Sequence, residues 1–155
     1  MRIGIIGPES TGKSTLAHYL AQRYDGILIP EYAREYVEQL PIGQAYTRDD
    51  VLKIAQQQVE ELRNLANQPA DRLIVFDTEL IITKVWMMHK WGECPDFLEK
   101  ALHDYPMDVY LLCYPDLDWV LDPVRENPTI REYLYDWYER EIHLLDIPYY
   151  IVRHI

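Results

Sequence analysis

The chain has 155 residues, of which 48% are hydrophobic and 26% are charged, and its formal net charge at pH 7 is -11. This length and composition are typical of one globular domain and exclude an intrinsically disordered chain. The acidic excess repels phosphate backbones and anionic lipid surfaces, so it argues against a general nucleic-acid or membrane binder.

Short apolar runs recur along the chain, each bounded by Gly, Pro or Asp. They cover residues 3–6, 27–29, 73–76, 109–113 and 149–152. Runs of this length that are rich in β-branched or aromatic residues are typical of strands buried on both faces of a parallel sheet. We therefore expect five parallel strands at these positions.

Longer amphipathic segments separate the runs. Thr47 and Asp50 have the spacing of a capping-box variant, and Thr129 and Glu132 have that of a full capping box. The alternation of strands and helices favours a three-layer α/β fold with helices on both faces of the sheet and right-handed crossovers. No repeat or linker interrupts the pattern, so a single domain over residues 1–155 is expected. The expected helices cover 13–23, 48–67, 79–91, 95–104 and 129–145.

The cysteines and histidines predict neither a disulfide framework nor a zinc site. Cys94 and Cys113 form no CxxC pair, and the five histidines form no HExxH motif. The segment before Pro8 is too short for a signal-peptide core, and no stretch approaches a membrane span. We therefore expect a soluble, cytoplasmic protein in a reducing compartment.

A complete GxxxxGK[ST] motif connects the first expected strand to the first expected helix, at residues 7–14. Gly7 and Gly12 let the backbone bend so that successive N–H groups point at phosphate oxygens. Lys13 supplies a mobile charge to the β- and γ-phosphates, and Ser14 offers a hydroxyl to Mg²⁺. The positive end of the following helix adds to this attraction. Nucleotide binding is therefore the strongest functional prediction from the motifs.

The third expected strand is followed at once by a carboxylate, Asp77. An apolar strand that ends in Asp is typical of a Walker B segment, whose carboxylate holds Mg²⁺ beside the phosphate loop. The same pattern also occurs as a plain strand cap. Because a phosphate loop lies upstream, we predict that Asp77 binds the metal.

Glu31, Tyr32 and Arg34 follow the second expected strand. Ligands collect at the carboxyl ends of strands in an open α/β sheet, so Glu31 is expected where a second substrate faces the γ-phosphate. A carboxylate there can accept a hydrogen bond from a sugar hydroxyl and take its proton, and Arg34 can steady phosphate charge. The alternative is an acidic first helical turn that complements a helix dipole.

A loop with two prolines and an Asn follows the fourth expected strand, at residues 122–128. Arg125 lies in it and Arg131 comes just after it. We predict a lid over about residues 116–131, whose arginines neutralise charge on a transferred phosphoryl group. Surface ion pairs with the abundant acidic residues are the alternative.

Aromatic residues lie near several of these strand ends. Tyr32, Tyr36, Trp86 and Trp119 could each stack on a planar base, and core filling is the alternative for each of them. The aromatic count does not choose among them. Tyr32, Trp86 and Trp119 are the rings that we predict to contact a substrate.

Four ordered segments resemble a known family. They read GPESTGKSTLA from residue 7, PEYAREY from 30, FDTELIITKVW with WGECP from 76, and YLLCYPDLDWVLDPVRE from 110. They resemble the ribosylnicotinamide kinase domain of the NadR type, a P-loop kinase related in fold to nucleoside and nucleotide monophosphate kinases. The resemblance covers nearly the whole chain. It implies a five-stranded parallel sheet and transfer of the ATP γ-phosphate to the ribose 5′-hydroxyl of nicotinamide riboside, giving NMN.

The resemblance also implies roles for particular residues. Glu31, Tyr32, Arg34 and Asp77 face substrate and metal, and Arg125 belongs to the lid. Bifunctional members of the family also carry an adenylyltransferase, so only the kinase step is expected of this chain. The residues that hold ATP are Gly7, Glu9, Ser10, Thr11, Gly12, Lys13, Ser14 and Thr15.

We therefore expect a small-molecule kinase that uses ATP and Mg²⁺ on a nucleoside, with nicotinamide riboside as the leading acceptor. Catalysis rests on positioning and charge stabilisation, because phosphoryl transfer leaves little covalent chemistry to the protein. A nucleotide-dependent switch with slow hydrolysis and a kinase for another small acceptor are the alternatives. The acceptor, the choice of ATP or GTP and the oligomeric state stay open. The expected roles are Lys13 on the phosphates, Ser14 and Asp77 on Mg²⁺, Glu31 on the acceptor hydroxyl, and Arg125 and Arg131 on the transition state.

Overall fold

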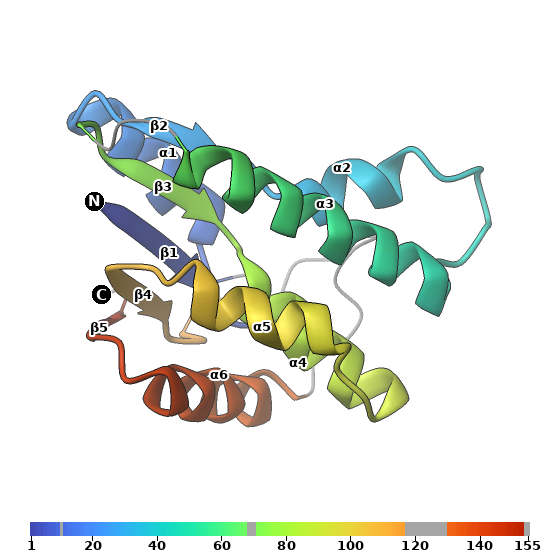
Figure 1. Cartoon of the computed structure of the whole chain (residues 1–155). Helices are drawn as coiled ribbons and strands as arrows, with labels where there is room; N and C mark the ends of the chain where they lie inside the picture. Colours follow the sequence, from blue (N-terminus) through green and yellow to red (C-terminus); the bar gives the residue numbers. More distant parts are fainter. Residues whose placement is uncertain (10, 68–70, 117–129, 154–155) are drawn as a thin grey trace.

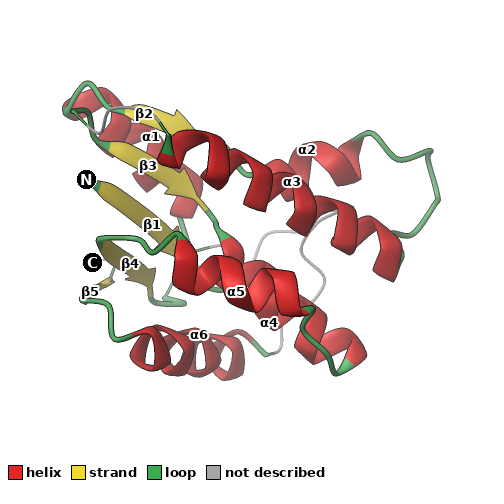
Figure 2. Cartoon of the chain, viewed as in Figure 1, coloured by secondary structure: helices red, strands yellow, loops and turns green. Residues whose placement is uncertain are grey.

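The computed structural model describes residues 1–9, 11–67, 71–116 and 130–153. In this part of the chain the centre of the molecule is a five-stranded sheet in the order β2-β3-β1-β4-β5, with every neighbouring pair parallel (Figure 2). The three-layer α/β prediction is therefore confirmed. The strands are β1 (Arg2–Ile6), β2 (Ile27–Ile29), β3 (Ile74–Asp77), β4 (Val109–Cys113) and β5 (Tyr149–Val152).

Helices cover both faces of the sheet (Figure 1). The core on one face is formed with α1, where Ala17 and Ala21 pack against Ile5 and Val75. The larger core on the other face is formed with α3, α4, α5 and α6. The helices are α1 (Lys13–Arg23), α2 (Tyr32–Glu38), α3 (Arg48–Ala66), α4 (Leu80–Trp91), α5 (Asp96–Asp104) and α6 (Arg131–Leu145).

The strand register brings the functional loops to one edge of the sheet. Ile5 of β1 pairs with Asp77 of β3, and Ile29 of β2 pairs with Phe76. The carboxyl ends of β1, β2 and β3 therefore lie side by side, as parallel pairing requires. This is the edge at which an open α/β sheet binds its ligands.

The element boundaries differ from the expected ones in a few places. Strand β3 begins one residue later than the apolar run and includes Asp77. Helix α2 was not predicted as an element, because it is only seven residues long and follows directly on Pro30 and Glu31. The capping box predicted at Thr47 and Asp50 is confirmed at the start of α3. Thr47 Oγ1 accepts a hydrogen bond from the Asp50 amide, and the Asp50 carboxylate accepts one from the Thr47 amide.

The capping box predicted for the last helix depends on Thr129, which lies outside the described residues. Helix α6 begins at Arg131, with Ile130 as its N-cap residue. In its first turn Arg131 reaches across to the phosphate loop and donates a hydrogen bond to the Glu9 carbonyl.

None of the helices in the described ranges has the length and apolar character needed to cross a membrane.

Candidate active site

The phosphate loop runs from the end of β1 to the start of α1, as predicted. Gly7 has φ 155°, and a Cβ at this position would lie 2.7 Å from the Cys113 carbonyl oxygen. Gly12 adopts a left-handed conformation with φ 79° and forms the N-cap of α1. Both glycines are therefore required by the backbone, one for space against β4 and one for its conformation. Of the other loop residues, Ser10 falls outside the described ranges.

Lys13 lies at the centre of this loop and is 5% exposed. Its Nζ donates a 2.8 Å hydrogen bond to the Pro8 carbonyl, which also accepts a 2.9 Å bond from Thr11 Oγ1. A charged group in so enclosed a position interacts strongly with any anion that enters the loop, because water screens it little. The geometry suits a phosphate-binding lysine.

Ser14 and Asp77 meet beside the lysine. Ser14 Oγ donates a 2.7 Å hydrogen bond to Asp77 Oδ2. The other carboxylate oxygen, Asp77 Oδ1, is buried and has no hydrogen-bond partner among the described residues. A buried oxygen without a partner is unfavourable unless a ligand satisfies it, so this pair is chemically suited to a divalent cation. The described residues contain no cluster of three or more metal-ligating side chains.

The chain turns sharply after Asp77. Thr78 has φ 61°, which is unusual for a branched residue, while its amide donates to the Ile5 carbonyl at 3.0 Å. Backbone conformations of this kind cost free energy and cluster at functional sites. Here the turn leaves Thr78 lining a hollow at this edge of the sheet.

That hollow, the acceptor hollow, contains about 770 Å³ of space, part of which is open to solvent. Lys13 and Glu31 both line it, so the phosphate loop and the carboxylate after β2 face the same space. Of the predicted site residues, Gly7, Glu9, Lys13, Glu31 and Trp86 line this hollow.

Glu31 and Arg34 form an ion pair at the N-terminus of α2. Glu31 is the N-cap of α2, but its side chain makes no capping hydrogen bond. Instead its Oε2 lies 3.4 Å from Arg34 Nε, and the two side chains are 12% and 27% exposed. A carboxylate at the N-cap also complements the helix dipole without a capping hydrogen bond. Glu31 at the same time lines the hollow.

Tyr32 and Tyr36 do not line the acceptor hollow. Tyr32 lines a smaller neighbouring hollow of about 300 Å³ together with Glu61 and Glu79. The Tyr36 hydroxyl donates a 2.7 Å hydrogen bond to Asp50, the carboxylate that caps α3. This bond raises the pKa of Tyr36 to about 12. Tyr36 thus joins α2 to α3 and is a structural residue.

Among the described residues of the predicted aromatic set, Trp86 lines the acceptor hollow. Its indole Nε1 donates to the Tyr46 hydroxyl at 3.1 Å, and the two rings meet edge-on with centroids 4.9 Å apart. The Tyr46 hydroxyl also accepts a 2.9 Å bond from Lys90. The ring of Trp86 is therefore fixed in place by a partner on the loop before α3.

The lid residues are described only in part. Arg125 and Trp119 fall in the segment outside the described residues, as does most of the expected lid over 116–131. Arg131 is described, and its Nη1 donates a 3.3 Å hydrogen bond to the Glu9 carbonyl. An arginine therefore reaches the phosphate loop from the start of α6.

Several lining residues were missed in the sequence. Thr83 Oγ1 donates a 2.6 Å hydrogen bond to Gln58 Oε1, and both line the hollow with His89 and Tyr138. On α4 the sequence pattern could have indicated these residues, because Ile82, Trp86 and His89 recur at helical spacing and so share one face of the helix. Gln58 and Tyr138 carried no local signal, since only tertiary packing brings α3 and α6 to this edge.

A second hollow, the donor hollow, lies on the α1 side of the phosphate loop and has a volume of about 550 Å³. Its lining is apolar in character and includes Thr11, Thr15 and the half-exposed ring of Tyr19. The loop therefore separates two spaces, one against α1 and one against α3, α4 and α6. Such an arrangement suits two ligands that meet at the phosphates.

A buried acid, Glu79, lines the smaller hollow beside Tyr32. Burial raises the pKa of Glu79 to about 7, although the Ile81 amide and Tyr110 donate hydrogen bonds to its carboxylate. Burial also raises the pKa of Tyr110 well above its usual range. Glu79 forms the N-cap of α4 and so ties the helix that carries Trp86 to β4.

Solved structures share this architecture. A crystal structure of NadR protein in complex with NR aligns with 98% of the chain and 42% of its own chain, with a TM-score of 0.73 and 24% identity. Thymidylate kinase from Ehrlichia chaffeensis aligns with 99% of the chain and 86% of its own, with a TM-score of 0.66 and 13% identity. The fold is therefore that of P-loop nucleoside and nucleotide kinases.

Sequence comparison points the same way. The trifunctional NAD biosynthesis/regulator protein NadR of Escherichia coli is 29% identical over 125 residues, which are 79% of the chain. The chain spans only 30% of the length of that relative, so it is similar to one part of a longer protein. The resemblance to the NadR type is thereby confirmed. The model of the AAA domain family AAA_28 matches residues 2–154, and the chain belongs to this family.

Proposed function

We propose that the chain is a small-molecule kinase that transfers the γ-phosphoryl group of ATP to the 5′-hydroxyl of a nucleoside. The observation that carries this proposal is that Lys13 of the phosphate loop and Glu31 line one hollow. A lysine beside the phosphates and a carboxylate beside the acceptor are the groups that phosphoryl transfer to an alcohol requires. A cytoplasmic location, with no nucleic-acid or membrane partner, belongs to the same proposal.

ATP is the proposed donor. Its phosphates bind the N–H groups of the loop and Lys13, and its base enters the donor hollow beside Tyr19. A NadR structure in complex with NAD and AMP-PNP, 24% identical, supports an adenine nucleotide. The proposed ATP ligands remain Gly7, Glu9, Ser10, Thr11, Gly12, Lys13, Ser14 and Thr15.

Magnesium is the proposed metal, and Ser14 and Asp77 are its proposed protein ligands. The fit rests on the buried, unpartnered Oδ1 of Asp77 and on the oxygen-only donor set. When bound, the ion neutralises charge on the phosphates of the nucleotide. One or two protein oxygens are enough for Mg²⁺, because water and phosphate supply its other ligands.

The acceptor is proposed to be nicotinamide riboside, giving NMN. Its pyridinium ring is planar and positively charged, and the acceptor hollow is lined by the aromatic Trp86 and the acidic Glu31. The net charge of -11 also favours a cationic over an anionic acceptor. The NadR structure in complex with NR supports this choice.

Different side chains are proposed to have different roles in the transfer. Glu31 accepts the proton of the 5′-hydroxyl, while Lys13 and Arg131 stabilise charge on the transferred group. Arg34 holds the Glu31 carboxylate in position by their ion pair. Arg125, which lies outside the described residues, is proposed to complete the lid, and Tyr32 and Trp119 stay proposed substrate contacts.

The first test is ATP consumption with Mg²⁺, measured with and without nicotinamide riboside, with the product identified by mass spectrometry. A strong dependence on the riboside, with NMN formed, is expected. Stimulation by another nucleoside alone would keep the kinase and replace the acceptor. Hydrolysis that no nucleoside stimulates would instead favour a nucleotide-dependent switch.

A pair of tryptophan variants tests the acceptor hollow. Trp86→Leu removes the indole ring from the acceptor hollow. We expect the KM for the riboside to rise about tenfold and the KM for ATP to stay unchanged. Trp91→Leu is the matched control, because Trp91 also packs on Tyr46, with ring centroids 6.5 Å apart, but does not line the hollow. Equal effects of the two variants on the riboside KM would contradict a stacking role.

A further inference from the structure

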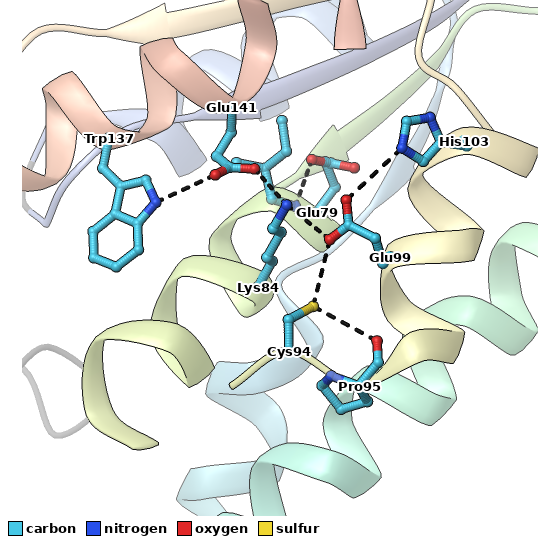
Figure 3. A network of polar contacts seen from close by, with 9 residues as sticks. Glu79, Lys84, Cys94, Pro95, Glu99, His103, Trp137 and Glu141 are labelled. Carbon is cyan, nitrogen blue, oxygen red and sulfur yellow. Dashed lines mark hydrogen bonds and ion pairs between the residues drawn. The ribbon is translucent and has the colours of Figure 1, made fainter. Parts of the chain in front are cut away.

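A buried ion-pair network joins α4, α5 and α6 next to the acceptor hollow (Figure 3). Lys84 Nζ of α4 lies 2.7 Å from Glu141 Oε1 of α6 and 2.8 Å from Glu99 Oε2 of α5. The side chains of Lys84 and Glu141 are 9% and 10% exposed, whereas that of Glu99 is 44% exposed. The contact between Lys84 and Glu141 is therefore the enclosed part of the network, and Glu99 closes it from the solvent side.

Lys84 is charged in this environment. Burial alone lowers the pKa of its ammonium group, but the hydrogen bonds to Glu141 and Glu99 raise the pKa overall. An enclosed ion pair contributes little net stability, because the cost of removing both charges from water offsets their attraction. What such a pair does provide is a specific geometry, since its hydrogen bonds fix two side chains at defined positions.

Both partners adjoin residues that line the acceptor hollow. Thr83 and Val85, on either side of Lys84 in α4, line it. On α6, Tyr138 lines it one helical turn before Glu141. The ion pair therefore joins α4 and α6, two helices that line the hollow.

A second path leads from Glu141 to the hollow. Its Oε2 accepts a 3.3 Å hydrogen bond from Trp137 Nε1. The Trp137 ring meets His89 edge-on, with ring centroids 6.3 Å apart, and His89 lines the hollow. Glu141 thus bonds to Lys84 and also positions Trp137 of its own helix against His89 of α4.

Helix α6 is held at its other end by the phosphate loop, where Arg131 donates to the Glu9 carbonyl. The helix therefore has a polar anchor near each end: Arg131 on the loop and Glu141 on α4. The residues between these anchors include Leu134 and Tyr138, which form the α6 side of the hollow.

We propose that Lys84 and Glu141 are positioning residues, whose ion pair fixes α6 relative to α4 and thereby sets the width of the acceptor hollow. This inference rests on the proposed function, because it assigns the hollow to the acceptor. Loss of the pair displaces Tyr138, which lines the acceptor hollow, so it weakens acceptor binding. Arg131 keeps its own anchor on the Glu9 carbonyl, so nucleotide binding at the loop and in the donor hollow is unchanged.

Paired charge-neutralising variants test the proposal. Glu141→Gln keeps the shape of the side chain and removes the inner carboxylate, whereas Glu99→Gln removes the outer carboxylate from the same lysine without touching α6. We expect Glu141→Gln to raise the KM for the nucleoside about tenfold, with the KM for ATP within about twofold of wild type. Glu99→Gln should leave both values within about twofold.

Amide hydrogen exchange of residues 131–145, followed by mass spectrometry, reports the position of α6 without any turnover. Faster exchange in the second half of α6, around Tyr138 and Glu141, in Glu141→Gln but not in Glu99→Gln is the expected result. Equal acceptor KM values for both variants, or unchanged exchange in Glu141→Gln, would overturn the proposal. If the wild-type chain phosphorylates no nucleoside, the proposed function fails, and the exchange difference alone decides whether the pair fixes α6.

If Glu141→Gln does not fold, the double variant Lys84→Met/Glu141→Leu replaces it, because an apolar pair leaves no buried charge unpaired. We expect this variant to fold with a raised acceptor KM, since apolar side chains do not fix the helix register as an ion pair does. A wild-type KM in the double variant would overturn the positioning role.

Discussion

Ser14 Oγ donates a 2.7 Å hydrogen bond to Asp77 Oδ2, across 63 residues of sequence. The bond closes the gap between the first turn of α1 and the last residue of β3. It exists because β1 and β3 are parallel neighbours, with Ile5 paired to Asp77. The hydroxyl and the carboxylate that the motifs predicted as metal ligands are therefore in direct contact, and Asp77 Oδ1 remains buried without a partner among the described residues.

The metal assignment predicts a specific change in magnesium dependence. Asp77→Asn replaces an anionic ligand by a neutral one of the same shape, so the Mg²⁺ concentration for half-maximal activity should rise about tenfold or more. A magnesium titration of the rate at saturating ATP measures it. Glu60→Gln, at an exposed position on α3, is the control. An unchanged titration for Asp77→Asn would mean that Asp77 serves only to end the strand.

Lys13 should be needed for the rate. In Lys13→Ala the charge at the phosphates is lost, and we expect the transfer rate to fall about 100-fold or more. Circular dichroism should report an intact fold, because the lysine packs against its own loop and not in the main core. Lys53→Ala on the exposed face of α3 is the control. A Lys13→Ala rate half that of wild type would contradict the assignment.

Glu31 separates a kinase from a switch. Glu31→Gln removes the proton acceptor, so nucleoside phosphorylation should fall about 100-fold while ATP affinity stays within about twofold. Glu35→Gln, one turn further along α2 and exposed, should behave like wild type. The two activities are followed separately, as NMN formed and as phosphate released. Normal phosphorylation in Glu31→Gln would exclude its role as the base.

Glu79 should make stability depend on pH. Its pKa rises from an ordinary 4.5 to about 7 on folding, because burial favours the neutral acid. The folded chain therefore binds this proton more tightly than the unfolded chain, so the stabilisation is fully present below pH 4.5 and is lost as pH rises through 7.

The size of this effect is about 3 kcal/mol at most in the free energy of unfolding. Urea unfolding at a series of pH values between 5 and 8 measures it. In Glu79→Gln the part of the decline due to this residue should disappear, whereas Glu132→Gln, exposed on α6, should retain the wild-type slope. Parallel slopes for wild type and Glu79→Gln would show that the carboxyl keeps its ordinary pKa.

Most of the fold could be predicted from local pattern. The expected strands at 27–29, 109–113 and 149–152 and the expected helix at 13–23 coincide with the observed elements. The strands are short apolar runs bounded by Gly, Pro or Asp, and the helix follows directly on the phosphate-loop motif, so local sequence specifies them. Strand β5 is nevertheless partly exposed, with Tyr150 and Ile151 at the surface, and is not buried on both faces as its apolar run predicts. Helix α2 was missed because its seven residues carry too little periodicity to separate a helix from a loop.

The candidate site likewise contains residues that the sequence predicts and residues that only tertiary packing brings to it. Lys13, Ser14 and Asp77 come from motifs whose geometry is set by a tight loop and a strand end, and the structure brings them together. Gln58 and Tyr138 come from helices whose approach to the hollow depends on the packing of the whole α3–α6 layer. No short stretch of sequence contains that information.

The bond from Lys13 to the Pro8 carbonyl holds the ammonium group inside the phosphate loop. An ammonium group has three N–H donors, so it can keep this bond while it donates to a phosphate oxygen. Much of the conformational entropy of this long side chain is therefore lost on folding and not on nucleotide binding. The lysine is preorganised for the phosphates, and this lowers the entropic cost of binding them.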